Sequence, residues 1–313
     1  MIVCIEEKAS KIKDIEGYDT RPFSGDALPV EHCEEDPVFC VCSRGFAKSI
    51  AGKEPDNLAF IQLTSAGFDG VPLDYYSSKG IVVANAGGVY SIPIAETVVY
   101  SLLHFAKTFR NNPDNRRPKM TRAYGSICEL SGAEALILGT GNISAEVVKR
   151  LSSFDVLIDG YNPHYSSKPG YRTVIQDFSE LKRIVSKYRF VISALPDNED
   201  TKGLLEKSFF EAMSSDAIFV NVGRRATLDE RDLFHALKAR KIKGAVLDMF
   251  ELIPNPITNP FRRLNNVVVL PGVAAVSEES KRRLGELIKE NVRLAASGQR
   301  LNCIVSASKG GKL

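Results

Sequence analysis

The sequence predicts an open α/β fold in two domains, in which helices cover both faces of parallel sheets. The chain has 313 residues, which is enough for two domains of ordinary size. Short apolar runs such as VFCVCS and LAFIQL alternate with polar segments that carry helical spacing. From residue 135 the same alternation restarts and continues through six strands, as a complete doubly wound sheet requires.

Composition and charge exclude several classes of protein. Hydrophobic residues make up 44% and charged residues 25% of the chain, which is typical of a globular protein and argues against disorder. A formal net charge of +3 is too small for a nucleic-acid-binding surface. No run of about 18 apolar residues is present, so we expect no membrane-spanning helix.

The cysteines and the first residues indicate a cytoplasmic protein. The six cysteines lack paired CxxC spacing, so neither a disulfide framework nor a metal site is expected. The first ten residues, MIVCIEEKAS, do not have the pattern of a secretion signal.

In the first part of the chain, strands are expected at residues 2–7, 38–43, 58–63 and 80–86. A long helix is expected at 91–110, with Ser91 as its cap and Pro93 in its first turn. This helix is apolar on more than one side, which is typical of burial between domains or subunits. Residues 111–120 are polar and rich in proline and arginine, and are expected to form a surface connection.

The second part alternates strands and helices without a break. Strands are expected at 135–139, 156–161, 190–196, 217–223, 244–250 and 266–271. Helices are expected at 142–154, 178–188, 208–213 and 228–241, and a last helix at 278–298 is expected to return to the first domain.

The sequence LILGTGNISAE carries the main binding motif. Gly139 and Gly141 stand between a strand and a helix, where one glycine allows a tight turn and the other lets the backbone approach a pyrophosphate. The charge of that group is favoured by a helix amino terminus. Ser144 replaces the third glycine of the pattern. We therefore expect a dinucleotide, NAD or NADP, at this turn.

The choice between NAD and NADP is open. The acidic residue that contacts the ribose of NAD is expected about 20 positions after the glycines, and Asn162 occupies that place. Without a carboxylate, rejection of a 2′-phosphate weakens. His164, Lys168 and Arg172 are candidate contacts for such a phosphate.

Several blocks in order resemble the D-isomer-specific 2-hydroxyacid dehydrogenases. They include LTSAGFDGVPLDYYSSKGIVVANAGGVYSIPIAET, LSGAEALILGTGNIS, ALPDNEDTKGLL, NVGRRATLDERDLFHALKARKIKGAVLDMF and NVRLAASGQRLNCIV. The resemblance covers nearly the whole chain. It implies a Rossmann-like NAD(P)-binding domain at 93–284, inserted in a flavodoxin-like substrate domain formed by 1–92 and 285–313. It also implies a homodimer formed through the helix around Glu96 to Phe105.

The resemblance also implies roles for individual residues. Arg224, in NVGRR, is similar to the arginine that binds the carboxylate of a 2-oxo acid. Arg225 replaces a glycine of the family and either favours a dianionic substrate or points outward. Asp248 is similar to the aspartate that orients the nicotinamide, although a turn-capping role is nearly as plausible for it. Ala66 and Gly67 are similar to the substrate-carboxylate contacts. The remaining implied cofactor contacts are Asn142, Ile143, Leu195, Pro196, Thr201, Val222 and Gly223.

The acid–base pair of the family is absent from the sequence. Its histidine position is occupied by Gly272, in PGVA, and its glutamate position by Ile253. Glu251 lies near the second position, and no histidine follows His235. Loss of a positioned general acid typically costs about 10²–10⁴-fold in rate. Tyr90 is a candidate replacement, although a role as an ordinary loop aromatic is favoured for it.

Two functions follow from this pattern. The first is an NAD(P)-dependent oxidoreductase that transfers hydride between nicotinamide and a small 2-oxo or 2-hydroxy acid, with a divergent acid–base site. The second is a catalytically impaired NAD(P)-binding sensor or regulatory dimer. The presence of Arg224 favours the enzyme, because a pure cofactor sensor needs no substrate-binding cation.

Overall fold

The computed structural model describes residues 1–8, 12, 14–30, 35–107, 127–248, 259–270 and 272–305. The chain divides into two compact units, one formed by Met1–Tyr90 with Val276–Leu313 and the other by Ser91–Ala275. The boundaries expected from the sequence, at residues 92 and 285, differ slightly from these. The second of them falls within a helix that begins at Glu278. The α/β class with parallel sheets is confirmed.

The first unit is built on a five-stranded parallel sheet in the order β2-β1-β3-β4-β5. These strands span Asp19–Phe23, Ile2–Glu6, Val38–Cys42, Leu58–Leu63 and Val82–Ala84, in that order. All five residues of β3 are buried, as expected of a central parallel strand that is covered on both faces.

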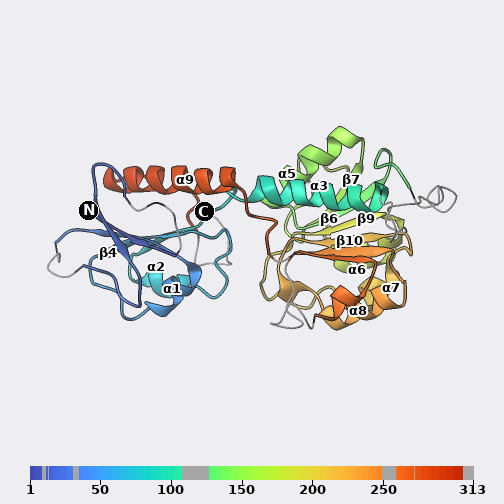
Figure 1. Cartoon of the computed structure of the whole chain (residues 1–313), viewed down its shortest axis with the longest axis horizontal. Coiled ribbons are helices and arrows are strands. Elements are labelled where there is room, and N and C mark those ends of the chain that lie inside the picture. Colours follow the sequence, from blue (N-terminus) through green and yellow to red (C-terminus); the bar gives the residue numbers. More distant parts are fainter. Residues whose placement is uncertain are drawn as a thin grey trace, which may run out of the picture. The chain divides into compact units, whose positions relative to one another are not determined.

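Helices cover both faces of this sheet (Figure 1). On one side lie α1 (Arg44–Ser49) and α2 (Leu73–Ser78), and on the other lies α9 (Glu278–Ala296). A capping box between Ser277 and Ser280 begins α9. Its buried side chains Leu284, Ile288 and Val292 pack in one apolar cluster with β1 and β3 residues. The last helix expected from the sequence is thereby confirmed.

The second unit contains a seven-stranded parallel sheet in the order β12-β11-β10-β9-β6-β7-β8. Its strands span, in that order, Val267–Val269, Gly244–Leu247, Ile218–Asn221, Phe190–Ser193, Glu134–Leu138, Leu157–Tyr161 and Val174–Ile175. On one face lie α3 (Ser91–Lys107) and α5 (Asn142–Leu151) (Figure 1). On the other lie α6 (Phe178–Ile184), α7 (Lys207–Ala212) and α8 (Glu230–Lys238).

Short 3₁₀ turns extend or connect these elements. They span Ser152–Phe154, Val185–Lys187, Arg225–Thr227 and Pro260–Arg263. The first two turns account for the end of the helices expected at 142–154 and 178–188, where α5 and α6 stop at Leu151 and Ile184. The sequence analysis expected Ser91 to cap the long helix at 91–110 from outside. In the structure Ser91 is the first residue of that helix, α3. Residues 108–110 lie outside the described part of the chain.

The sequence analysis missed two strands. The first is β2, whose sequence DTRPF lacks an apolar run and contains Pro22. Proline is tolerated there because β2 is an edge strand. The second is β8, an edge strand of only two residues, so the expectation of six strands in this sheet was one too few. Among the described residues, no helix is long and apolar enough to span a bilayer.

Candidate functional site

In the second unit, all the described strand ends that carry predicted binding residues lie at one edge of the sheet. The strands are parallel, so their carboxyl ends share that edge. Gly139 follows β6, Asn162 follows β7, Val222 follows β10 and Asp248 follows β11. The chain leaves β6 for β7 on one side and reaches β9 on the other, so the switch point lies between β6 and β9. Ligands of open α/β sheets bind at such a point.

The glycine turn after β6 allows two backbones to come close at the switch point. Gly139 has a φ of +87°, and a Cβ atom there would lie 2.9 Å from the carbonyl oxygen of Ala194, which follows β9. Gly223 makes a similar approach, since its Cβ would lie 2.7 Å from the backbone nitrogen of Leu195. A side chain at either position would push these strand ends apart.

Gly141 has a different role, because it leaves the start of α5 open. It is the N-cap residue of this ten-residue helix and provides no side-chain cap. A Cβ atom at Gly141 would meet no atom within 4 Å. The helix amino terminus therefore has room for an anionic group, which its dipole favours. These features fit a dinucleotide pyrophosphate.

Ser144, the departure from the glycine pattern, is accommodated without loss of packing. Its side chain is fully buried, and its hydroxyl donates to the carbonyl of Gly139 at 2.6 Å. Instead of separating helix and strand, the hydroxyl ties α5 to the glycine turn. Asn142 at the helix start is exposed, and Ile143 is half-buried against the core beside α5.

Asn162 lies directly beside the glycine turn. Its side-chain amide donates to the hydroxyl of Thr140 at 2.8 Å and accepts from the backbone N–H of His164 at 2.8 Å. Arg172, one of the three candidate phosphate contacts, instead binds Asp159 and Glu134 at 2.8 and 2.9 Å. These two carboxylates hold its pKa above the usual value. His164 is exposed and Lys168 lies over the ring of Tyr165, so both stay candidates.

Three predicted cofactor contacts have buried side chains. Leu195 and Val222 are 3% and 5% exposed and belong to the apolar clusters on the two faces of the sheet. Thr201 donates its hydroxyl to the carbonyl of Pro196 at 2.7 Å and holds the loop after β9. Leu195 and Val222 therefore shape the packing beneath the strand ends.

Arg224 is half-buried at the end of the segment that follows β10, and its Nη1 lies 3.5 Å from the carbonyl oxygen of Gly223. Thr227 donates its hydroxyl to the Arg224 carbonyl at 2.7 Å and so holds the backbone of this segment in place. Arg225 is exposed and begins a 3₁₀ turn. Of the two interpretations of Arg225, its exposure favours the outward one.

Asp248 caps the loop that follows β12. Its Oδ1 accepts the N–H groups of Val273 and Ala274 at 2.9 and 3.2 Å, and the residue is 8% exposed. Burial raises the pKa of this carboxyl, and the backbone donors partly offset that effect. The structure thus shows the turn-capping role that the sequence analysis considered nearly as plausible as nicotinamide orientation.

Gly272, which the sequence analysis places at the family histidine position, lies in the loop that Asp248 holds. Its φ is +71°, a conformation that strains a residue with a side chain, and it is exposed. Val273 beside it is 45% exposed. Ile253 and Glu251, at and near the family glutamate position, lie outside the described residues.

In the first unit, the loop that contains Ala66 and Gly67 follows β4. Both residues are half-buried. The Ser65 hydroxyl donates to the carbonyl of Gly67 at 2.7 Å, and the Ala86 N–H donates to the carbonyl of Ser65 at 3.0 Å. Asp69, which follows in the same loop, forms an ion pair at 2.6 Å with Arg44 at the start of α1.

Asn85 supports the same loop from beneath and was missed by the sequence analysis. It is 2% exposed, donates to the carbonyl of Ala66 at 2.6 Å and accepts from the N–H of Gly87 at 3.0 Å. Its backbone N–H donates to the carbonyl of Cys303, so the segment after α9 is part of the support. The available signal was a polar residue directly after the strand in GIVVANA.

A second buried amide, Asn291 of α9, fixes that C-terminal segment. Its Nδ2 donates to Oε1 of Gln62 at 2.6 Å, and its Oδ1 accepts from the N–H of Asn302 at 2.7 Å. Arg283 of the same helix donates to the carbonyl of Val89 at 3.0 Å. Buried amides are costly unless paired, so these bonds specify one arrangement of the segments around the loop.

Tyr90 is a poor replacement acid on this geometry. Its hydroxyl donates to the carbonyl of Thr64, and burial raises the pKa of the phenol. A phenol whose pKa is raised is a weaker proton donor near neutral pH. The loop-aromatic interpretation is therefore the better one.

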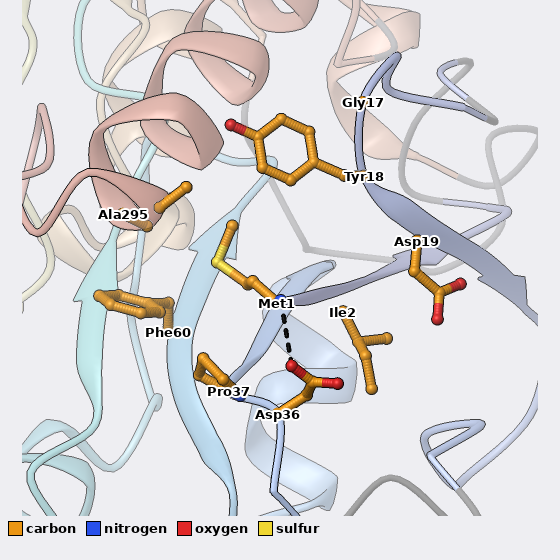
Figure 2. Close-up of a pocket in the computed structure, with 10 residues that line it drawn as sticks. Met1, Ile2, Gly17, Tyr18, Asp19, Asp36, Pro37, Phe60 and Ala295 are labelled. Carbon is orange, nitrogen blue, oxygen red and sulfur yellow. Dashed lines mark hydrogen bonds and ion pairs between the residues drawn. The ribbon is translucent and has the colours of Figure 1, made fainter.

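A cavity of about 500 Å³ lies at the opposite edge of the first sheet, at the amino ends of β1 and β2 (Figure 2). Its carboxylates are already paired, Asp36 with the Met1 ammonium at 3.4 Å and Asp19 with Arg21 at 2.7 Å. It contains none of the predicted binding residues. The site therefore has to be sought at the carboxyl edges.

The NAD-binding domain model of the D-isomer-specific 2-hydroxyacid dehydrogenases matches residues 99–274. The chain belongs to the D-isomer-specific 2-hydroxyacid dehydrogenase family. Hydroxypyruvate reductase of Thermotoga maritima is 30% identical over 246 residues, which cover 77% of this chain and 78% of that protein. D-3-phosphoglycerate dehydrogenase of Methanocaldococcus jannaschii is 28% identical over 81% of this chain. The chain spans about half of that relative, 48% of its length.

Solved structures agree with this family. A D-isomer specific 2-hydroxyacid dehydrogenase family protein from Aeromonas salmonicida is 25% identical with a TM-score of 0.76, and the match covers 98% of this chain and 99% of that one. D-mandelate dehydrogenase of Rhodotorula graminis, 15% identical, has a TM-score of 0.82 over 97% of each chain and so shares the fold. The resemblance noted from the sequence blocks is thereby confirmed.

We predict that Asp248→Asn makes stability less dependent on pH. The pKa of Asp248 is raised in the folded state. The free energy of unfolding of the wild type therefore decreases as pH rises from the unfolded-state pKa near 3.8 through the raised folded-state pKa. An asparagine oxygen can accept the same two N–H groups without ionising. The free energy of unfolding, measured by urea titration at pH 4 and pH 7, should therefore favour the variant more at pH 7. An equal difference at the two pH values would contradict the prediction.

We predict that Asn85→Ala loosens the loop around Ala66. Removing a buried amide that bonds two backbone groups typically costs about 1–3 kcal/mol. Hydrogen exchange of the amides at 64–69 should become at least about 10-fold faster, since 1.4 kcal/mol corresponds to a factor of 10. Asn57→Ala is the control, because that half-buried residue makes a similar bond, which is exposed, to the carbonyl of Asp36 at 2.7 Å and lies outside the loop at 64–69. Unchanged exchange at 64–69 in Asn85→Ala would refute the supporting role.

Proposed function

We propose that the protein is an NAD(P)-dependent oxidoreductase that transfers hydride between nicotinamide and the carbon next to the carboxylate of a small acid. One observation carries the proposal, the shared edge at which the open Gly139–Gly141 turn and the half-buried Arg224 both lie. The names of family relatives, glyoxylate reductase and hydroxypyruvate reductase, agree with a small 2-oxo or 2-hydroxy acid.

Individual residues have the following proposed roles. The backbone at Gly139, Gly141 and Asn142 binds the pyrophosphate at the start of α5, and Asn162 faces the adenosine ribose. Pro196, Thr201 and the backbone of Leu195 and Val222 flank the dinucleotide. Arg224 binds the substrate carboxylate through its planar guanidinium. In the first unit, the loop at Ala66 and Gly67 offers backbone N–H groups to a carboxylate.

When bound, the nicotinamide supplies the hydride donor or acceptor. The protein supplies position and charge. Arg224 fixes the carboxylate, and Asp248 holds the loop after β12 that carries Gly272. Oδ1 of Asp248 accepts hydrogen bonds from the protein backbone. Its second oxygen, Oδ2, is a candidate acceptor for the nicotinamide amide.

We predict that Arg224→Ala weakens the binding of a 2-oxo acid more than the binding of the cofactor. NADH and NADPH are titrated by their fluorescence, and the same samples are then mixed with pyruvate, glyoxylate and hydroxypyruvate. The variant should keep its cofactor affinity within about threefold and raise the KM for the acid by at least about 10-fold, because a charged hydrogen bond worth about 1.5–3 kcal/mol is lost. Arg225→Ala, the neighbouring exposed arginine, is the matched control.

The outcomes separate the two functions. Cofactor binding with an acid-dependent change in absorbance supports the oxidoreductase. Tight binding without turnover on any substrate would instead indicate an NAD(P)-binding sensor. Absence of binding of either nucleotide would refute the role assigned to the glycine turn.

We further propose that the protein forms a homodimer through α3. Tyr100 on this helix is 59% exposed, whereas Val98 and Leu102 beside it are buried. A helix that is apolar on more than one side is typical of burial between domains or subunits. Light scattering after size exclusion should give the mass of a dimer at micromolar concentration. Tyr100→Asp should shift the protein toward monomer, and a wild-type monomer would contradict the proposal.

A cytoplasmic location belongs to the same proposal. Five cysteines are described, and all five are free thiols. Reduced thiols are typical of the cytosol rather than of secreted proteins.

A further inference from the structure

The loop after β12 has a backbone conformation at Gly272 that favours glycine. Gly272 has a φ of +71°, where any side chain is strained, although a Cβ there would meet no atom within 4 Å. The next two residues are tied to Asp248 through their N–H groups. The substitution at Gly272 is thus accompanied by a backbone conformation that suits it.

The same substitution sets the charge at this part of the edge. In the described segments 244–248, which contain β11, and 272–275, which lie after β12, Asp248 is the one ionisable side chain, while Arg224 and Arg225 follow the neighbouring β10. Two N–H donors favour its charged form. A cationic side chain at position 272 would lie near the Asp248 carboxylate. Glycine at position 272 provides no such positive charge. The edge near β11 and β12 therefore favours a cationic group in its ligand.

The chemistry of hydride addition depends on what accepts the hydride. A ketone that accepts hydride at carbon becomes an alkoxide, which needs a proton from a donor. An iminium carbon accepts hydride as its C=N π pair moves to nitrogen, which becomes the lone pair of a neutral amine. No proton is required in that step, because the nitrogen carried it beforehand, and the amine takes a further proton from water after release.

We propose that the substrate of this protein is a 2-imino acid, the iminium formed from a 2-oxo acid and ammonia or a primary amine, which is reduced to the 2-amino acid. The inference rests on the proposed function, in which Arg224 binds the carboxylate and reduced nicotinamide is the hydride source. Gly272 removes the proton donor that a ketone needs, and the Asp248 carboxylate favours the positive charge of the iminium. An iminium avoids the loss of about 10²–10⁴-fold that a missing general acid causes.

The test compares the two substrate classes on the full chain. The protein is supplied with whichever of NADH and NADPH it binds more tightly, together with pyruvate alone, pyruvate plus methylammonium, or the preformed cyclic imine 1-pyrroline-2-carboxylate. Mass spectrometry identifies lactate, N-methylalanine or proline. The expected result is turnover of both imines at least about 100-fold above that of pyruvate alone. Arg224→Ala should raise the KM for pyruvate and for both imines alike, because all three carry the carboxylate, and Arg225→Ala should not.

Product binding provides a readout that does not need turnover. With oxidised cofactor present, N-methylalanine should raise the melting temperature more than lactate at the same concentration, because it brings a cation to the Asp248 region. Asp248→Asn should remove that difference when the two products are compared at a concentration of oxidised cofactor that saturates the variant.

The failures can be told apart. Equal rates with pyruvate alone and with the imines, or equal shifts with both products, would overturn the imino-acid inference and leave the proposed oxidoreductase standing. Cofactor binding without turnover of any of the three substrates, or of glyoxylate and hydroxypyruvate, would overturn both.

Discussion

The structure depends on one constraint, the parallel alignment of every strand in each sheet. In a parallel sheet all carboxyl ends open at one edge, so loops that are far apart in sequence become neighbours without any direct bond between them. Residues 139, 162, 224, 248 and 272 share an edge for this reason alone. The same constraint requires helices on both faces, and the buried strands of both sheets satisfy it.

Within that frame, small local features decide what the edge can do. Gly139 allows close approach to Ala194, and Gly141 leaves the helix start open. The buried Ser144 hydroxyl shows that a departure from a motif can be absorbed by one hydrogen bond. By contrast, the Gly272 proposed at the family histidine position has a backbone conformation that a side chain would strain.

Asp248 illustrates how one carboxylate can serve structure and charge together. It satisfies two backbone N–H groups in a loop that would otherwise leave them unpaired near the end of a sheet. Its burial raises the pKa of the carboxyl, and Arg224 and Arg225 follow the neighbouring strand β10 at the same edge. The substrate selection by charge that we propose rests on this carboxylate and on Arg224.

The sequence by itself determined the class of fold, the order of its main strands, the position of the glycine turn and the family, because hydrophobic periodicity and local motifs are encoded by neighbouring residues. It also located the substitution at Gly272. It missed β2 and β8, since edge strands need no apolar run. Only the tertiary structure decided that Asp248 caps the loop after β12, that Arg172 is paired with Asp159 and Glu134, and that Asn85 supports the loop at Ala66. Each is a contact between segments remote in sequence, whose partners are set by strand order and packing rather than by local pattern.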